Sequence, residues 1–277
     1  PGQRDVKVVN PDGKAGTLAL GFTYNDDIFD RPAPQVLALV PDHGPYQGGT
    51  VLAVYGKDFQ VGARVLFGGK PATLHLVEDG LATVTTPPGF IGNVDVTVLN
   101  PDGQSASLPA GFSYISTNVA APNLLGITPK SGPESGGTAV IFTGAKFTGG
   151  GVGFVGYRPV SSWTVLNSAI ATGTTPPSVP GPTDVVVTNG DGQSSTLVGA
   201  WDYVGAPHID SFDPAVGATV GGKVVLLAGK NFSFQAKVEI GGKLAASVDV
   251  LSPLAIRIQT PAHDPGPVQV KVTNPDG

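Results

Sequence analysis

Histidines have the most versatile side-chain chemistry in this sequence, because imidazole binds metals and moves protons near neutral pH. There are four of them: His43, His75, His208 and His263. A zinc site needs several ligands at characteristic spacings, and none of the four has another histidine or a carboxylate cluster at such a spacing. A hydrolase nucleophile would favour a Gly-x-Ser-x-Gly elbow above a helix, and the sequence lacks that motif. We therefore expect no catalytic residue, no metal ligand and no enzymatic activity.

Two loop segments could bind charged ligands. The glycines at 149–151 lack the lysine, the hydroxyl residue and the helix of a phosphate-binding loop, so we expect a plain loop and no cofactor. The segment 25–30, Asn-Asp-Asp-Ile-Phe-Asp, is the only cluster of carboxylates. Calcium takes roughly six to eight oxygen ligands. We favour a solvated linker at 25–30, and an interdomain calcium site is the alternative.

Aromatic side chains could bind a sugar by stacking. Pairs spaced two residues apart recur as Phe22 and Tyr24, Phe112 and Tyr114, and Trp201 and Tyr203. Residues two apart share one face of a strand, and one face of a sandwich strand is core, so we interpret the pairs as core. Four other aromatics, without an aromatic equivalent in every repeat, are candidates for ligand contact: Trp163, Tyr157, Tyr46 and Phe90.

A repeat of about 88 residues positions all of these side chains. The tetrapeptide Asn-Pro-Asp-Gly occurs at 10–13, 100–103 and 274–277, with Asn-Gly-Asp-Gly at 189–192. The asparagines are 90, 89 and 85 residues apart. In such a turn proline sets φ, Asp caps the local backbone and Gly takes the left-handed position. We assign structural turn roles to Asn10, Gly13, Asn100, Gly103, Asn189, Gly192, Asn274 and Gly277.

Each repeat reads as about seven short strands separated by turns rich in glycine and proline. Residues 94–98 and 268–272 alternate strictly between apolar and polar, which predicts half-buried strands. The run at 36–41 ends in proline, which cannot donate to a ladder, so it predicts an edge strand. No long window has helical periodicity. The fold class we predict is therefore all-β, an array of tandem immunoglobulin-like β-sandwiches.

Composition excludes several classes of function. The net charge of −5 and a charged fraction of 13% leave no basic surface for nucleic acid. The chain has no cysteine, so disulfides and zinc-thiolate sites are impossible. No run approaches the ~20 apolar residues that span a bilayer, so we expect no membrane insertion within this segment. Methionine is absent even at position 1, and no signal peptide precedes the first repeat, so we interpret the chain as an internal fragment.

The ordered motifs of this chain are similar to those of the IPT/TIG family of immunoglobulin-like domains. They are Gly-Pro-x-x-Gly-Gly-Thr at 44–50 and 132–138, Phe-Gly-Gly at 67–69, the Thr-Pro steps, the Asn-Pro-Asp-Gly turns and Phe-x-Tyr. The third repeat departs from the pattern at 216–223, which lacks the Gly-Pro and the threonine. In this frame residues 1–24 are the C-terminal hairpin of a partial repeat, 34–115 and 122–204 are complete repeats, and 207–277 is a partial repeat lacking its last strand.

The two partial repeats at the ends suggest an assembly. If the ends of neighbouring chains complete one sandwich, strand addition would build a head-to-tail filament. The alternative is that the chain is one phase of a longer array.

We predict a non-catalytic structural or adhesive segment of an extracellular, cell-surface or fibre-forming protein, with self-association or neighbouring repeats as partners. The low charge and the lack of cysteine fit a prokaryotic surface protein better than a disulfide-bearing receptor. The alternative is a carbohydrate-binding accessory array of a secreted glycan-active enzyme, with a cell-surface glycan as partner.

Overall fold

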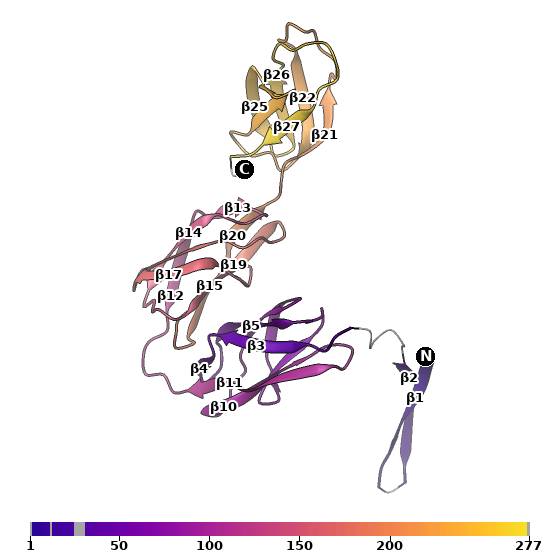
Figure 1. Cartoon of the computed structure of the whole chain (residues 1–277), viewed down its shortest axis with the longest axis vertical. Coiled ribbons are helices and arrows are strands. Elements are labelled where there is room, and N and C mark those ends of the chain that lie inside the picture. The colour runs from indigo at the N-terminus through magenta and orange to yellow at the C-terminus, as the bar shows by residue number, and fades with distance from the viewer. Residues whose placement is uncertain (1, 12, 25–30, 276–277) are drawn as a thin grey trace. The chain divides into compact units, whose positions relative to one another are not determined.

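The chain is an all-β array. A computed structural model describes residues 2–11, 13–24 and 31–275, and every regular element within them is a strand. The chain divides into two compact units, residues 1–118 and 119–277. The strands form three two-sheet bodies and one hairpin (Figure 1). In the ranges described, no helix has the length and apolar character to cross a membrane. The predicted fold class of tandem immunoglobulin-like sandwiches is confirmed.

Repeat 1, residues 34–115, pairs a four-stranded sheet with a five-stranded sheet. The first sheet has the order β3 (Gln35–Val40), β5 (Val51–Lys57), β9 (Leu81–Thr85) and β8 (Thr73–Glu78). The second has the order β4 (His43–Pro45), β11 (Ser105–Ile115), β10 (Gly92–Leu99), β6 (Arg64–Phe67) and β7 (Lys70–Pro71). Strand β3 lies at a sheet edge, as its terminal proline predicts.

Repeat 2, residues 122–204, has the same two sheets. The first sheet has the order β12 (Asn123–Thr128), β14 (Ala139–Ala145), β18 (Ile170–Thr174) and β17 (Ser161–Asn167). The second has the order β13 (Ser131–Pro133), β20 (Ser194–Val204), β19 (Gly181–Thr188), β15 (Val152–Val155) and β16 (Arg158–Pro159).

Repeat 3, residues 207–277, has a complete first sheet and a shorter second sheet. The first has the order β21 (His208–Asp213), β22 (Val224–Lys230), β26 (Ala255–Gln259) and β25 (Ser247–Ser252). The second has the order β24 (Lys243–Leu244), β23 (Lys237–Ile240) and β27 (Val270–Thr273). Within the described part of this repeat, no strand pairs with the second edge of β27, the edge that the last strand covers in repeats 1 and 2.

The N-terminal hairpin, β1 (Gly2–Val9) and β2 (Ala15–Tyr24), forms a sheet of its own. It has the register of the last hairpin of repeat 1, because Gly2 faces Tyr24 as Gly92 faces Tyr114. Both hairpins bulge at an aspartate, and Asp5 Oδ1 accepts from the Leu20 N–H at 2.8 Å. The hairpin therefore matches β10–β11 in its register and in the position of its bulge.

Each repeat has its own core between its two sheets. In repeat 1, Leu52 and Val84 from one sheet meet Val96 and Phe112 from the other, and all four are fully buried. Repeats 2 and 3 have separate clusters of the same kind. Burial of one such side chain stabilises a fold by roughly 1.5–3 kcal/mol, so each repeat is stabilised without disulfides.

Candidate functional site

The aromatic pairs of the last strands lie in the cores of repeats 1 and 2. Phe112 and Tyr114 are at most 1% exposed and meet edge to face at 5.0 Å between ring centroids. Trp201 and Tyr203 are at most 2% exposed and meet at 5.8 Å. Their contacts are those of core residues, as the sequence predicts.

The tyrosine of each pair also fixes a loop. The Tyr114 hydroxyl donates to the Pro87 carbonyl at 2.7 Å, and the Tyr203 hydroxyl donates to the Pro176 carbonyl at the same distance. Burial raises the pKa of both tyrosines to about 12. The Tyr114 ring lies so close to Gly89 that a Cβ there would be 2.4 Å from a ring carbon.

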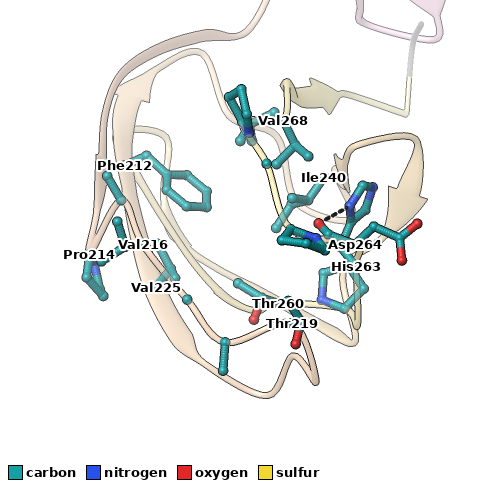
Figure 2. A pocket seen from close by; sticks show the side chains of 18 residues that line it. Phe212, Pro214, Val216, Thr219, Val225, Ile240, Thr260, His263, Asp264 and Val268 are labelled. Carbon is teal, nitrogen blue, oxygen red and sulfur yellow. Dashed lines mark hydrogen bonds between the residues drawn. The ribbon is translucent and has the colours of Figure 1, made fainter.

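Repeat 3 has a cavity of about 580 Å³ where repeats 1 and 2 hold their aromatic pairs. Figure 2 shows Phe212, Val225, Ile240 and Val268 lining it. In the shared frame Ile240 corresponds to Phe67, whose ring meets Phe112 edge to face at 5.2 Å. The cavity offers an apolar wall to an aromatic side chain, which makes it the candidate site of this chain.

The rim of the cavity supplies polar groups. Thr260, His263 and Asp264 line it (Figure 2), and so does Pro261. Pro261 occupies the position of Pro87 and Pro176, the carbonyls that accept from the buried tyrosines. A ligand with an aromatic body and a hydroxyl at its end therefore fits the chemistry of the cavity.

The turn asparagines do more than shape their own turns. Asn100, Asn189 and Asn274 are at most 4% exposed. Each donates from Nδ2 to a backbone carbonyl 42 or 43 residues earlier, at 2.7–2.8 Å. Sequence reasoning missed these hydrogen bonds. The nearly equal distance along the chain between each asparagine and the residue whose carbonyl it binds was a usable signal.

Trp163, a predicted ligand contact, packs against the core of repeat 2. Its ring meets Phe142 edge to face at 5.0 Å, and its Nε1 is buried. Gly153 makes room for it, because a Cβ on Gly153 would be 2.4 Å from the indole. The ring of Trp163 is therefore engaged in packing.

Tyr157 is half-buried, and its hydroxyl donates to Asp184 Oδ2 at 2.9 Å. Burial, followed by this hydrogen bond and the Asp184 charge, raises the pKa of Tyr157 to about 12. Asp184 Oδ1 accepts from the Gly199 N–H at the hairpin bulge. The hydroxyl of Tyr157 thus takes part in the hydrogen bonding around that bulge.

Phe90 and Tyr46 lie on the surface of repeat 1. Phe90 is 85% exposed, and the Lys70 ammonium lies 5.3 Å from its ring centroid. Tyr46 is 39% exposed, and its carbonyl accepts from the Gly89 N–H at 2.8 Å, which ties the two loops together. Ligand contact by either residue stays a prediction.

The histidines each interact locally. His43 contacts Asp42 at 2.8 Å, His75 contacts Thr85 at 2.7 Å, and His208 contacts Asp210 at 3.3 Å. His263 donates to the Gly241 or the Asp264 carbonyl, depending on its tautomer. Among the described residues no three histidine or carboxylate side chains gather into a group that could hold a metal ion. The segment 25–30, which we predict to be a solvated linker with a calcium site as the alternative, lies outside the described residues, as does Gly277.

Comparison with known proteins gives one family. The model of the IPT/TIG domain matches residues 34–114, 122–199 and 207–277. Plexin-B3 of Homo sapiens and of Mus musculus are each 28% identical to this chain over 212 residues. Those alignments cover 72% of this chain and 11% of each plexin, so the chain spans about a tenth of the relatives it matches.

Several solved structures are similar to this chain, among them a plexin region and an SGBP-B. The extracellular region of Plexin A4 has 18% identity and a TM-score of 0.33, covering 94% of this chain and 24% of that one. SGBP-B from a complex xyloglucan utilization locus in Bacteroides uniformis has 13% identity and a TM-score of 0.31, covering 88% of this chain and 98% of that one.

Proposed function

Because this chain belongs to the IPT/TIG family, we propose that it is a non-catalytic structural and adhesive segment of an extracellular surface protein. One observation carries the structural role: each repeat holds the linker that precedes it. The Gln104 amide donates to the Arg31 carbonyl at 2.9 Å, and the Gln193 amide donates to the Val119 carbonyl at 3.1 Å.

The linker before repeat 3 is held in a different way. The Asn231 amide donates to the Ala206 carbonyl at 3.1 Å. Each hydrogen bond restricts the motion of a linker that would otherwise move freely. A segment that must transmit position or force along a surface protein benefits from linkers held in this way.

Single-molecule pulling on the whole chain tests the structural role. Repeats 1 and 2 should unfold as separate events with similar contour lengths, because each has its own core. The double variant Gln104→Ala with Gln193→Ala should leave the unfolding force unchanged but widen the distribution of end-to-end distances, measured by fluorescence energy transfer. Unfolding without separable events, or an unchanged distance distribution, would contradict the proposal.

Glycan binding is the second candidate function, and the exposed Phe90 ring favours it. Aromatic faces stack on sugar rings, and Lys70 beside the ring can donate to a hydroxyl. A glycan array probed with the whole chain tests this role. Phe90→Ala should abolish binding, whereas Val61→Ala, at another position that is 85% exposed in the same repeat, should leave binding intact. An array without a bound glycan would remove this candidate.

A further inference from the structure

We propose that the pair Asn189–Gly190 in repeat 2 is a site of spontaneous deamidation that the fold protects, so that Asn189 is converted only when repeat 2 unfolds. This pair is the only Asn-Gly in the sequence. The fraction of converted Asn189 then measures how long repeat 2 has been unfolded. The reaction is independent of the proposed structural role.

The reaction needs no reagent except water. The Gly190 backbone nitrogen attacks the side-chain carbonyl carbon of Asn189, and the new N–Cγ bond closes a cyclic succinimide. The Cγ–Nδ2 bond breaks, and the amide nitrogen leaves as ammonia with the proton of the Gly190 N–H. Water then opens the ring at either carbonyl, which leaves aspartate or isoaspartate at position 189. Glycine after the asparagine favours ring closure, because it has no Cβ and its backbone is mobile when unfolded.

The equivalent turns of repeats 1 and 3 cannot react in this way. Asn100 is followed by Pro101, and Asn274 is followed by Pro275. Proline has no backbone N–H, so its nitrogen cannot lose a proton to give the neutral succinimide. Among the three repeats the site therefore belongs to repeat 2 alone.

The fold of repeat 2 requires the glycine at 190. A Cβ on Gly190 would overlap the Gly149 carbonyl oxygen, and a Cβ on Gly151 would overlap the Thr188 carbonyl oxygen. The loop at 149–151 and the turn that begins at Asn189 therefore approach each other backbone to backbone. Proline, which the other repeats have at this turn position, has no room here, and the reactive Asn-Gly pair is the consequence.

The folded chain holds the Asn189 side chain away from the reaction. Asn189 is 2% exposed, its Nδ2 donates to the Lys146 carbonyl at 2.7 Å, and its Oδ1 accepts from the Thr148 N–H at 3.0 Å. The reaction requires the amide group to rotate toward the Gly190 nitrogen and water to reach the ring. Both steps require these two hydrogen bonds to break, so folding protects the asparagine.

The products do not fit the folded repeat. Aspartate at 189 would place a carboxylate oxygen against the Lys146 carbonyl, where the structure has a donor. Two facing acceptors repel each other, and a buried charge is costly unless it is paired. Isoaspartate adds a methylene to the main chain of the turn. Deamidation should therefore be an irreversible loss of stability in repeat 2.

Peptide mass spectrometry of the whole chain, kept in mildly alkaline buffer with and without guanidinium chloride, tests the site. Asn189 should be converted at least about 100-fold more slowly in the folded chain, because the free energy of opening sets the reactive population. Asn100 and Asn274 should stay unchanged under both conditions. An Asn189 that survives in the unfolded chain, or that reacts equally fast in the folded chain, would overturn the proposal.

Exchanging the residue after the asparagine gives matched variants. They are measured in guanidinium chloride, so their effects on folding play no part. Gly190→Pro should abolish the reaction at Asn189, and Pro101→Gly should create one at Asn100. Continued reaction at Asn189, or none at Asn100, would contradict attack by the following backbone nitrogen and overturn the proposal.

Core variants test whether the reaction follows the unfolding of repeat 2. Trp163→Ala removes a ring that packs on the core of repeat 2 and should speed conversion of Asn189 in native buffer by at least about tenfold. Leu52→Ala, at a fully buried position in the core of repeat 1, is the control and should leave this rate unchanged. Equal rates in the two variants would overturn the dependence on repeat 2.

A variant that carries the product tests its effect on stability. Asn189→Asp should lower the melting temperature of repeat 2 by on the order of 10 °C. Asn10→Asp, at the same turn position but with an exposed side chain, is the control and should leave the melting curve unchanged. An Asn189→Asp chain as stable as the natural one would overturn the predicted loss.

Discussion

The side chain of Asn100 holds the backbone of Asp58, because its Nδ2 donates to the Asp58 carbonyl at 2.8 Å. Its Oδ1 accepts from the Gln60 N–H at 3.2 Å. Asp58 has a φ of 57°, a left-handed conformation that L-residues rarely adopt. The asparagine therefore fixes the strained bend that follows the central strand β5.

The same arrangement recurs in the other repeats. The Asn189 side chain donates to the carbonyl of Lys146, which has a φ of 62°. The Asn274 side chain donates to the carbonyl of Asn231, which has a φ of 58°. In the N-terminal hairpin the turn closes in the same way, from the Gly13 N–H to the Asn10 carbonyl, but the Asn10 side chain is exposed. The turn thus forms without the long-range hydrogen bonds, which are a separate role of the asparagine.

Asn100→Ala should destabilise repeat 1. The change leaves a part-buried carbonyl and a part-buried N–H without these partners, each costing about 1–3 kcal/mol. We expect a loss of about 2–4 kcal/mol in the free energy of unfolding, measured by urea denaturation. Asn10→Ala is the matched control, with an expected change within about 0.5 kcal/mol. Equal effects of the two substitutions would show that the turn, and not the bend, needs the asparagine.

Much of the fold could be predicted from local patterns. The proline-terminated run at 36–41 is an edge strand, and the aromatic pairs of repeats 1 and 2 lie in the core, because alternation and proline report directly on strand faces and ladders. The long-range role of Asn100 could not be predicted in this way. Turn rules relate residues within four positions, whereas this hydrogen bond spans 42.

The cavity of repeat 3 and the packing of Trp163 also depend on distant partners. For repeat 3, only the arrangement of Ile240 against Phe212 and Val225 shows an open, apolar space. Trp163 is singled out in the sequence as a departure. The space for its ring comes from a second departure from the repeat pattern, Gly153, which lies on a strand of the other sheet.

Trp163 and Gly153 should therefore be energetically coupled. Trp163→Ala should destabilise repeat 2 by about 3–5 kcal/mol through the cavity it leaves, and Gly153→Val should destabilise it by about 1–3 kcal/mol through a clash with the indole. In the double variant the valine occupies part of the cavity, so the two losses should sum to more than the observed loss. Thermal unfolding of the four proteins measures this coupling, and strict additivity would contradict it.

Chelation of divalent ions should leave the chain unchanged. We favour a solvated linker at 25–30, where Asp26, Asp27 and Asp30 are too few carboxylates for the roughly six to eight oxygens of calcium. The melting temperature of the whole chain should be the same in EDTA and in millimolar calcium. A rise in calcium that Asp26→Asn with Asp27→Asn removes would establish the alternative, a calcium site in this linker.

Alkaline pH should destabilise repeats 1 and 2 through their buried tyrosines. Burial raises the pKa of Tyr114 and of Tyr203 to about 12, whereas an unfolded tyrosine has a pKa of about 10. Folding thus favours the neutral hydroxyl. The stability that the neutral hydroxyl contributes is complete below pH ~10 and is lost as pH rises from ~10 toward ~12.

Melting temperatures measured from about pH 8 to about pH 11 test this dependence. Tyr114→Phe with Tyr203→Phe should lower the melting temperature at pH ~8, because each loses a hydrogen bond worth about 1 kcal/mol. The same variant should reduce the fall above pH ~10, because two titrating groups are gone, whereas Tyr157, whose pKa is also raised to about 12, still titrates. Tyr46→Phe, at an exposed ring in repeat 1, serves as the control and should leave the curve unchanged. A double variant as sensitive to alkali as the natural chain would assign the alkaline loss to other groups.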